Sequence, residues 1–173
     1  MPLCREGIKS AEKAAKELAG LKINKVYTSP LIRNRETVSL ILKNLGEEKL
    51  LVIVNKALDE RNYGELQGLN KDEVKKQYGE EQVKLWRRSY DIAPPGGESL
   101  KDVYKRAVPF HKKYIEKDLK AGKNVLIVAS HNSLRAIVKY IENISDEKII
   151  DLELPFGALV KYNFNEGKYT KFA

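Results

Sequence analysis

The residue best suited to catalysis is His131, because it lies where an apolar run at 125–129 meets the start of a predicted helix. Backbone N–H groups point outward at a helix N-terminus, and the helix dipole favours an anion there. A histidine at such a point can act as an acid, as a base or as a phosphate contact. Position alone does not separate this role from that of a loop histidine bonded to backbone. The second histidine, His111, is predicted to lie mid-helix on the surface, beside Lys112 and Lys113.

Arginines in structured contexts are the candidate anion-binding residues, since a planar guanidinium can hold phosphate or carboxylate through two parallel hydrogen bonds. Arg33 is close to the N-terminus of the helix that follows the first predicted strand. Arg87 and Arg88 form either a two-pronged phosphate clamp or a solvated helix face. Glu60, beside Arg61, is either a general acid or base or half of a local ion pair. The other arginines of this kind are Arg35 and Arg135.

The charge balance is compatible with an anionic ligand. Thirty-two Lys and Arg against 24 Asp and Glu give a net charge of +8, which favours anionic partners. Most lysines are spaced as on a solvated helix face. Neither a basic block nor a basic–aromatic alternation occurs, so no nucleic-acid partner is expected. The sequence contains no Gly-Lys-Ser/Thr phosphate loop, no Gly-x-Gly-x-x-Gly after a strand and no Cys/His metal spacing, which argues against nucleotide binding of those kinds and against structural zinc.

Length and composition predict one globular domain. The 173 residues suit a single domain. The single cysteine, Cys4, excludes an internal disulfide framework and fits a reducing compartment. No run approaches the ~18 apolar residues that a membrane-spanning helix needs, and the N-terminus lacks the apolar region of a signal peptide. We therefore expect a cytoplasmic protein without a membrane partner.

Apolar spacing predicts an alternation of helices and strands that would position these residues. A helix is expected over 5–19, then a strand at 22–28, and then a helix with Val38, Ile41, Leu42 and Leu45 on its buried face and Gly46 after it. The later elements are a buried strand at 50–54, polar helices at 71–78 and 80–90, a long helix from Ser99 kinked at Pro109, a buried strand at 125–129, a helix with Leu134, Ile137, Val138 and Ile141 on one face, and a hairpin of 158–164 and 168–172.

This alternation is typical of an α/β fold with a mainly parallel sheet. Ligands in such folds bind at the carboxyl ends of the strands. Two predicted strand ends are conspicuously polar, at 28–33 and at 130–133. We expect these two segments to form the site.

Four stretches carry a family resemblance: YTSPLIR at 27–33, LDERNYGELQGLNK at 58–71, YGEEQVKLWRRSY at 78–90 and NSLRAIVKY at 132–140. Together they resemble the cofactor-dependent phosphoglycerate mutases of the histidine phosphatase superfamily. The resemblance implies a three-layer α/β/α fold, with 1–173 as a single domain and a helical insertion at about 58–95. It also implies the interconversion of 3-phosphoglycerate and 2-phosphoglycerate, in glycolysis and gluconeogenesis, through a phosphohistidine primed by 2,3-bisphosphoglycerate and without a metal.

The resemblance also implies roles for individual residues. Arg33 matches the family's phosphate-pocket arginine, and Glu60 matches the glutamate proposed as proton donor. The other substrate-binding positions are Tyr63, Lys71, Arg87, Arg88 and Asn132. A doubly anionic substrate needs several charge-assisted donors, which is consistent with this set.

The sequence departs from the family pattern in two places. The family begins with a strand ending in Arg-His-Gly, whose histidine is the nucleophile, and this tripeptide does not occur in the sequence. The domain therefore resembles an N-terminally truncated mutase. The family's other histidine stands in His-Gly-Asn, whereas this sequence reads Ser130-His131-Asn132. A strict alignment puts Ser130 at the catalytic position; a loop shorter by one residue puts His131 there.

These departures lead to expectations about the chain itself. Without the nucleophilic histidine, the 173-residue chain is expected to show little or no mutase activity. The alternatives are a catalytically degenerate protein that binds phosphorylated ligands and a broad histidine phosphatase. Loss of a central strand would leave neighbouring strand edges unpaired, favouring marginal stability or pairing with another chain. A homo-oligomer is compatible with the family.

Overall fold

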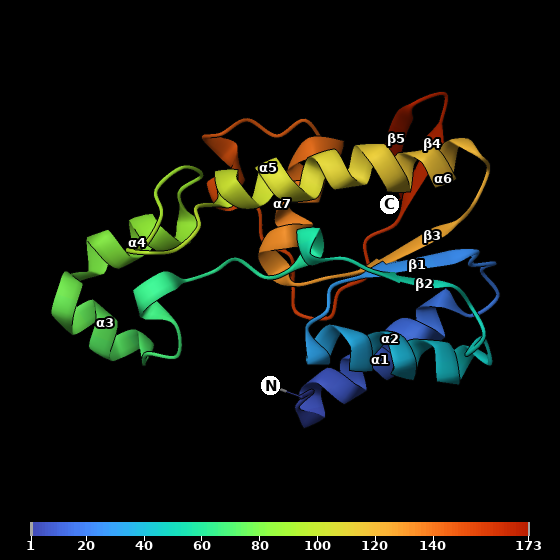
Figure 1. Cartoon of the computed structure of the whole chain (residues 1–173), viewed down its shortest axis with the longest axis horizontal. Coiled ribbons are helices and arrows are strands. Elements are labelled where there is room, and N and C mark those ends of the chain that lie inside the picture. The colour runs from blue at the N-terminus through green and yellow to red at the C-terminus, as the bar shows by residue number, and fades with distance from the viewer. Residues whose placement is uncertain (1, 173) are drawn as a thin grey trace.

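The computed structural model describes residues 2–172, in which helices and strands alternate along most of the chain (Figure 1). The helices are α1 (Arg5–Leu18), α2 (Ile32–Leu45), α3 (Lys71–Tyr78), α4 (Glu80–Arg88), α5 (Leu100–Phe110), α6 (Glu116–Lys120) and α7 (His131–Ile141), and the strands are β1 (Lys25–Thr28), β2 (Val52–Val54), β3 (Val125–Val128), β4 (Tyr162–Asn165) and β5 (Lys168–Lys171). Short 3-10 turns are η1 (Lys56–Leu58), η2 (Gly64–Leu66) and η4 (Lys148–Asp151). Within residues 2–172, no helix is long and apolar enough to cross a membrane.

The central sheet has three parallel strands in the order β2–β1–β3. Helices α1 and α2 pack together on one face of this sheet, and α5 and α7 pack together on the other (Figure 1). The predicted three-layer α/β/α architecture is therefore confirmed. The predicted hairpin is also present, as the antiparallel pair β4–β5 with shorter strands than expected. Its turn residues, Glu166 and Gly167, both have positive φ, as tight hairpin turns require.

Strand β1 lies in the middle of the sheet and joins the two halves of the core. Its side chains point alternately to the two faces, as in any strand. Val26 packs into the cluster formed by α1 and α2, and Tyr27 packs into the cluster formed by α5 and α7. Both side chains are almost fully buried. The carboxyl end of β1 is thereby held at the centre of the domain.

The two outer strands are less buried than the sequence predicts. Each of β2 and β3 pairs only with β1 among the described residues. Leu51 and Val54 are 58% and 46% exposed, and Leu126 is the only residue of β3 that is buried. The apolar runs at 50–54 and 125–129 do form strands, but the prediction that both are buried is wrong because an edge strand has a neighbour on one side only.

The prediction that His111 lies on the surface is also wrong. Proline removes a backbone N–H from its helix, and α5 passes after Pro109 into a π-helical turn, His111–Ile115. Such a turn shifts the register of side chains along the helix. His111 is 1% exposed, and its Nε2 lies 2.7 Å from the hydroxyl oxygen of Tyr169 on β5. Burial lowers the pKa of His111 to about 4.

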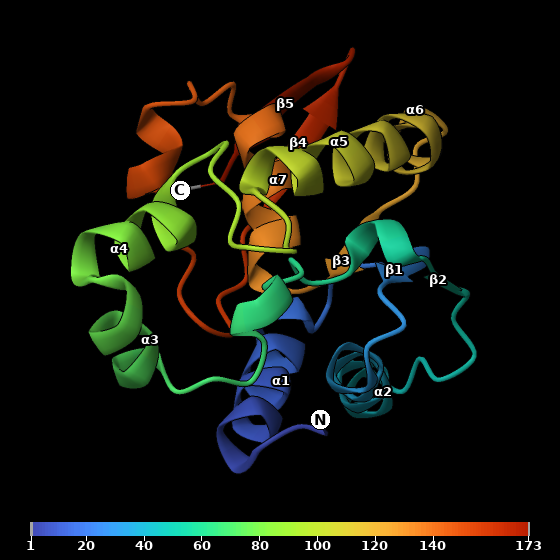
Figure 2. The same ribbon diagram turned by 60° about the vertical axis from the view of Figure 1, so that its left-hand side comes forward.

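Helices α3 and α4 form an arm that extends from the rest of the domain, as both views show (Figures 1 and 2). The arm has a small apolar cluster of its own, in which Val74, Val83 and Trp86 are buried. Asn70 caps α3, its side chain accepting a hydrogen bond from the N–H of Asp72. One tie to the domain is the hydrogen bond from Nη1 of Arg61 to the carbonyl of Trp86, at 2.9 Å.

Candidate active site

The candidate site lies where the carboxyl ends of β1 and β3 meet. The two strands are parallel neighbours with Thr28 opposite Val128, so the segments that follow them leave the sheet at the same edge. Ser29 follows β1 and is fully buried, and Ser130 follows β3 as the residue before α7. The two polar strand ends predicted from the sequence are therefore adjacent.

Four polar residues from these two segments form what we call the inner cluster: Ser29, Arg33, Asn34 and Ser130. The hydroxyl oxygen of Ser130 accepts hydrogen bonds from Nη2 of Arg33 and Nδ2 of Asn34, both at 3.1 Å. The same Asn34 nitrogen lies 2.8 Å from Oγ of Ser29. The Ser130 side chain makes no capping bond to α7. The cluster thus presents a guanidinium and hydroxyl groups beside the N-terminus of α7, an arrangement suited to an anion.

A second group joins Glu60, Tyr63 and Asn132. Oε1 of Glu60 accepts the backbone N–H of Asn132 at 3.3 Å and that of Arg61 at 2.7 Å. Nδ2 of Asn132 donates to the hydroxyl oxygen of Tyr63 at 3.2 Å. The structure therefore brings together three of the residues that the sequence nominates. The guanidinium of Arg61 lies over the Tyr63 ring instead of pairing with Glu60.

Buried arginines surround this second group. Arg135 is 2% exposed and donates to Oδ1 of Asn132 at 3.3 Å and to the carbonyl of Ile149 at 2.6 Å. Burial lowers the pKa of Arg135, and the positive charges of Arg61 and Arg88 lower it further. The Nε atoms of Arg61 and Arg135 are buried without a hydrogen-bond partner within residues 2–172. Three guanidinium groups, those of Arg61, Arg88 and Arg135, therefore act on one another here.

His131 begins α7, but it does not join the inner cluster. The residue is exposed, and its side chain makes no hydrogen bond among the described residues. Partial burial of the ring is the main cause that lowers its pKa, followed by the charge of Arg135, while the carboxylate of Glu60 acts in the opposite direction. At neutral pH the imidazole is therefore largely uncharged and can accept a proton. Within residues 2–172, Arg33 is hydrogen-bonded to Ser130 and not to His131.

The remaining predicted residues lie on the arm. Arg88 is exposed and donates to a carboxylate oxygen of Glu153 at 3.1 Å. Arg87 is half-buried, and Lys71 is the exposed first residue of α3. No hydrogen bond links Arg87 or Lys71 to the other predicted site residues within residues 2–172. The structure thus links Glu60, Tyr63 and Asn132 by hydrogen bonds and leaves the arm residues outside this network.

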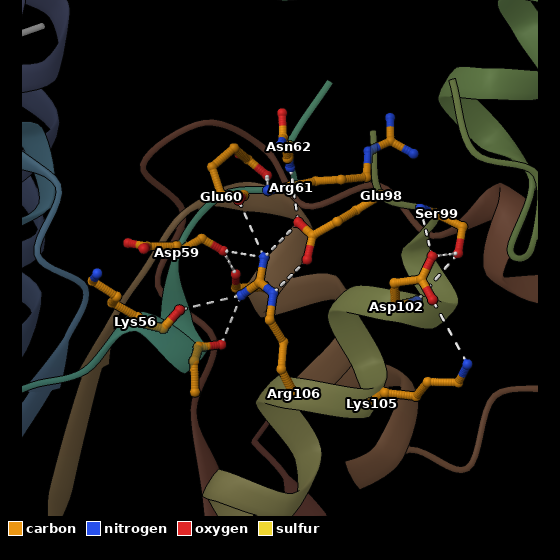
Figure 3. A network of polar contacts seen from close by, with 12 residues as sticks. Lys56, Asp59, Glu60, Arg61, Asn62, Glu98, Ser99, Asp102, Lys105 and Arg106 are labelled. Atoms are coloured by element: carbon orange, nitrogen blue, oxygen red, sulfur yellow. Dashed lines mark hydrogen bonds and ion pairs between the residues drawn. The ribbon is translucent and has the colours of Figure 1, made fainter. Parts of the chain in front are cut away.

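Sequence reasoning does not identify Arg106, which organises the loop that carries Glu60 (Figure 3). From α5, its Nη1 donates to the carbonyl of Ala57, and its Nη2 donates to the carbonyls of Asp59 and Glu60, at 2.9 to 3.1 Å. Its guanidinium also pairs with both carboxylate oxygens of Glu98. Helical spacing could have indicated that Arg106 faces the core, since it follows the buried Val103 by three positions. Asn34 of the inner cluster was also missed, and no sequence pattern pointed to it.

The pKa values of Glu98 and Asp59, two carboxyl groups near Arg106, shift in opposite directions. Burial raises the pKa of Glu98, but hydrogen bonds from Arg106 and from the N–H of Asn62 outweigh it and hold that pKa below its usual value. Burial also raises the pKa of Asp59, and there it prevails over the nearby positive charges of Arg106 and others. Oδ1 of Asp59 is buried without a hydrogen-bond partner within residues 2–172. Glu98 is therefore charged at neutral pH and anchors Arg106.

The turn after Tyr63 depends on a glycine. Gly64 has a φ of +56°, and a Cβ built there would collide with the carbonyl oxygen of Pro95. The backbone N–H of Glu65 donates to that same oxygen at 3.0 Å. The loop that positions Tyr63 thus packs directly against the 94–97 loop.

In the part of the chain that the structure describes, no three His, Cys, Asp or Glu side chains are grouped as metal ligands would be.

Known proteins resemble this chain along nearly its whole length. Residues 1–171 match the family described as the histidine phosphatase superfamily (branch 1). A 2,3-bisphosphoglycerate-dependent phosphoglycerate mutase of Chlamydia muridarum is 40% identical over 197 residues, covering 100% of this chain and 87% of that protein. The enzyme of the same name from Bartonella tribocorum is 47% identical over 165 residues, covering 94% of this chain and 80% of its own length.

The fold also matches solved structures. Bacillus stearothermophilus YhfR superposes with a TM-score of 0.85 at 20% identity, covering 98% of this chain and 82% of that one. At this identity the likeness concerns the fold alone. Sequence identity over nearly the whole chain places it more narrowly: it belongs to the 2,3-bisphosphoglycerate-dependent phosphoglycerate mutases, within branch 1 of the histidine phosphatase superfamily.

Proposed function

We propose that this chain binds 3-phosphoglycerate and 2-phosphoglycerate and serves their interconversion. The observation that carries the proposal is the excess of guanidinium groups around the N-terminus of α7. Arg61 and Arg135 are buried with unpartnered Nε atoms, and Arg88 adds its charge to theirs. Burying like charges together is costly unless an anion offsets them. A small ligand with a phosphate and a carboxylate supplies that anion.

The inner cluster is the proposed phosphate position. Arg33 is suited to a bidentate contact with phosphate. Asn34 and Ser130, which touch each other, hold the donors of this cluster at the start of α7. The arm residues Arg87, Arg88 and Lys71 are the proposed contacts for the ligand's other anionic group. Asn132 and Tyr63, which are hydrogen-bonded to each other, are the proposed contacts for the ligand's hydroxyl.

The same donor set fits 2,3-bisphosphoglycerate, which the family name implies. Its two phosphates and its carboxylate match the surplus of arginines at the inner cluster and on the arm. When bound, it supplies the priming phosphoryl group. The protein's part is to hold this polyanion in place and to neutralise its charge during transfer, which is the main contribution that phosphoryl transfer requires.

Glu60 and His131 are the proposed proton-transfer residues. Oε1 of Glu60 is held by two backbone N–H groups, and Oε2 has no hydrogen-bond partner within residues 2–172. That second oxygen is available to a substrate hydroxyl. The lowered pKa of His131, caused first by burial of its ring, keeps the imidazole able to accept a proton at neutral pH. Each residue thus has one free atom suited to general acid–base catalysis.

Binding without turnover is the second candidate, and the histidine positions favour it. The sequence has two histidines. His111 is buried against Tyr169, and His131 is not bonded to the inner cluster. Ser130 occupies the contact with Arg33 instead. We therefore expect the 173-residue polypeptide to bind phosphoglycerates with little or no conversion, since neither histidine side chain is hydrogen-bonded to the inner cluster within residues 2–172.

Two measurements on the 173-residue protein test this function. Isothermal titration calorimetry with 3-phosphoglycerate should show binding that Arg33→Gln weakens by about tenfold or more. Arg35→Gln, an exposed change on the same helix, is the matched control. Phosphorus NMR with and without 2,3-bisphosphoglycerate measures formation of 2-phosphoglycerate. Release of inorganic phosphate as the main product would identify a phosphatase instead, and equal affinity of the two arginine variants would contradict the proposed phosphate position.

A further inference from the structure

One carboxylate already occupies the arm side of the candidate site. Oε1 of Glu153 accepts a hydrogen bond from Nη2 of Arg88 at 3.1 Å, although the two residues are 65 positions apart in the sequence. Arg88 ends α4 in the arm, and Glu153 lies in the segment after η4. Their side chains are 45% and 73% exposed. The pair therefore bridges two separate parts of the chain at the surface of the site.

The charge of Glu153 acts on the same groups as the charge of Arg88. Glu153 raises the pKa of His131 and of Arg135, while Arg88 lowers both, although burial is the largest cause in each case. The Glu153 carboxylate thus lies close to the proposed proton acceptor and to a buried guanidinium. The Glu153 carboxylate therefore lies in the region where we propose that the carboxylate of the ligand binds.

Both partners are held in a way that allows the pair to open. Within residues 2–172, the bond to Arg88 is the only hydrogen bond made by the side chain of Glu153. The adjacent Leu152 packs against the core, whereas Phe156 is 75% exposed, so the backbone is anchored next to Glu153 while the Glu153 side chain itself stays in solvent. The arm has its own small core and few ties to the body. An exposed ion pair of this kind contributes little to folding stability, so an incoming anion can displace it readily.

We propose that Glu153 is a specificity-determining residue, an internal competitor whose carboxylate holds Arg88 until the carboxylate of a ligand replaces it. This inference rests on the proposed function, because it concerns the same site. A ligand with both a phosphate and a carboxylate recovers the Arg88 contact after displacing Glu153. A monophosphate that lacks a carboxylate leaves the Arg88–Glu153 pair intact and gains nothing from the arm. The Arg88–Glu153 pair thus weakens the binding only of those ligands that contact Arg88.

The test compares two ligands that differ in the carboxylate. The Kd values of 3-phosphoglycerate and of glycerol 3-phosphate are measured by titration calorimetry at low ionic strength, in wild type and in Glu153→Gln. We expect Glu153→Gln to tighten 3-phosphoglycerate binding by about twofold to fivefold. The Kd of glycerol 3-phosphate should change less. The difference should shrink at high salt, which screens exposed charges.

Two further variants separate competition from a general charge effect. Asp151→Asn removes an exposed negative charge two positions away in the same segment and should leave both Kd values unchanged. In an Arg88→Gln background, Glu153→Gln should no longer improve 3-phosphoglycerate binding. The inference is overturned if Glu153→Gln binds 3-phosphoglycerate no better than wild type, or if Asp151→Asn has the same effect. Failure of the proposed function has a different signature, namely 3-phosphoglycerate affinity that is insensitive to Arg33→Gln.

Discussion

The loop that carries Glu60 and the arm that carries Arg88 contribute to one candidate site, but they are held very differently. Arg106 bonds to three backbone carbonyls of the loop and to both oxygens of Glu98 at 3.1 Å or less. The arm is tied by single contacts, such as that between Arg61 and the carbonyl of Trp86. The side chains of Arg106 and Glu98 are about one-quarter exposed, whereas that of Glu153 is 73% exposed.

This difference indicates a division of labour within the site. Groups that act on the reacting atoms need fixed positions, because small displacements are costly for catalysis. Groups that receive a charged ligand from solvent benefit from freedom to exchange partners. We therefore expect changes in the loop to affect stability and catalysis together, and changes in the arm to affect ligand affinity alone.

The strongest test of this comparison is removal of Arg106. Arg106→Ala removes the guanidinium donor from the Glu98 carboxylate and from three loop carbonyls, and leaves Glu98 with the N–H of Asn62 and the Asp59 carbonyl with the hydroxyl of Ser133. The free energy of unfolding should fall by roughly 3 kcal/mol, since breaking a partly buried, hydrogen-bonded ion pair strands its partner. Urea denaturation measures the loss. Lys105→Ala, the exposed neighbour on α5, should cost less than about 0.5 kcal/mol, and an equal cost for both would refute the anchoring role of Arg106.

Two glycines allow the same comparison for the backbone. Gly64 lies in the loop and Gly68 lies before the arm, and both have positive φ. A Cβ at Gly68 meets nothing within 4 Å, whereas a Cβ at Gly64 collides with the Pro95 carbonyl. Gly68→Ala should cost about 1 kcal/mol from backbone strain alone. Gly64→Ala should cost roughly 2–3 kcal/mol because the collision adds to that strain. Equal melting temperatures of the two variants would show that the loop can move away from Pro95.

The pH dependence of stability should also separate the two regions. The pKa of Glu98 in the fold is below its unfolded value, so its contribution is present above pH ~4.5 and is lost as the pH falls through the folded pKa. Glu98→Gln should therefore flatten the decline in unfolding free energy on acidification. A hydrogen bond from Lys75 likewise lowers the pKa of Glu80 in the arm, but Glu80 is fully exposed. Glu80→Gln should leave the pH profile unchanged, and a matching change would contradict the comparison.

The smallest effect on stability is expected at Arg88. Arg88→Gln should change the free energy of unfolding by less than about 0.5 kcal/mol, because its ion pair is exposed. Its affinity for 3-phosphoglycerate should nevertheless fall by about tenfold, as loss of a charge-assisted contact predicts. Lys84→Gln, on the same helix, is the control for net charge. A large loss of stability without a loss of affinity would reverse the roles assigned to loop and arm.

Sequence patterns predicted the parts of the fold that depend on local chemistry. The helix expected at 5–19 is α1, and Gly46 ends α2 in the left-handed conformation. The sequence indicated the two polar strand ends, and the strand order β2–β1–β3 of the structure makes them neighbours. His111 was misplaced, since a π-helical turn after Pro109 alters the face on which it lies. The burial of 50–54 and 125–129 was overestimated, because an apolar run does not reveal whether its strand has one neighbour or two.

The amino-acid sequence by itself determined the family, the α/β layering and the identity of most candidate site residues, because apolar spacing and contiguous motifs are local properties. Only the tertiary structure decided which of these residues meet. It hydrogen-bonded Arg33 to Ser130 and not to His131 within residues 2–172; it assigned Arg106 to the Glu60 loop; and it paired Arg88 with Glu153 across 65 positions. Contacts of this kind depend on how elements distant in the chain pack together, and no local pattern encodes that packing.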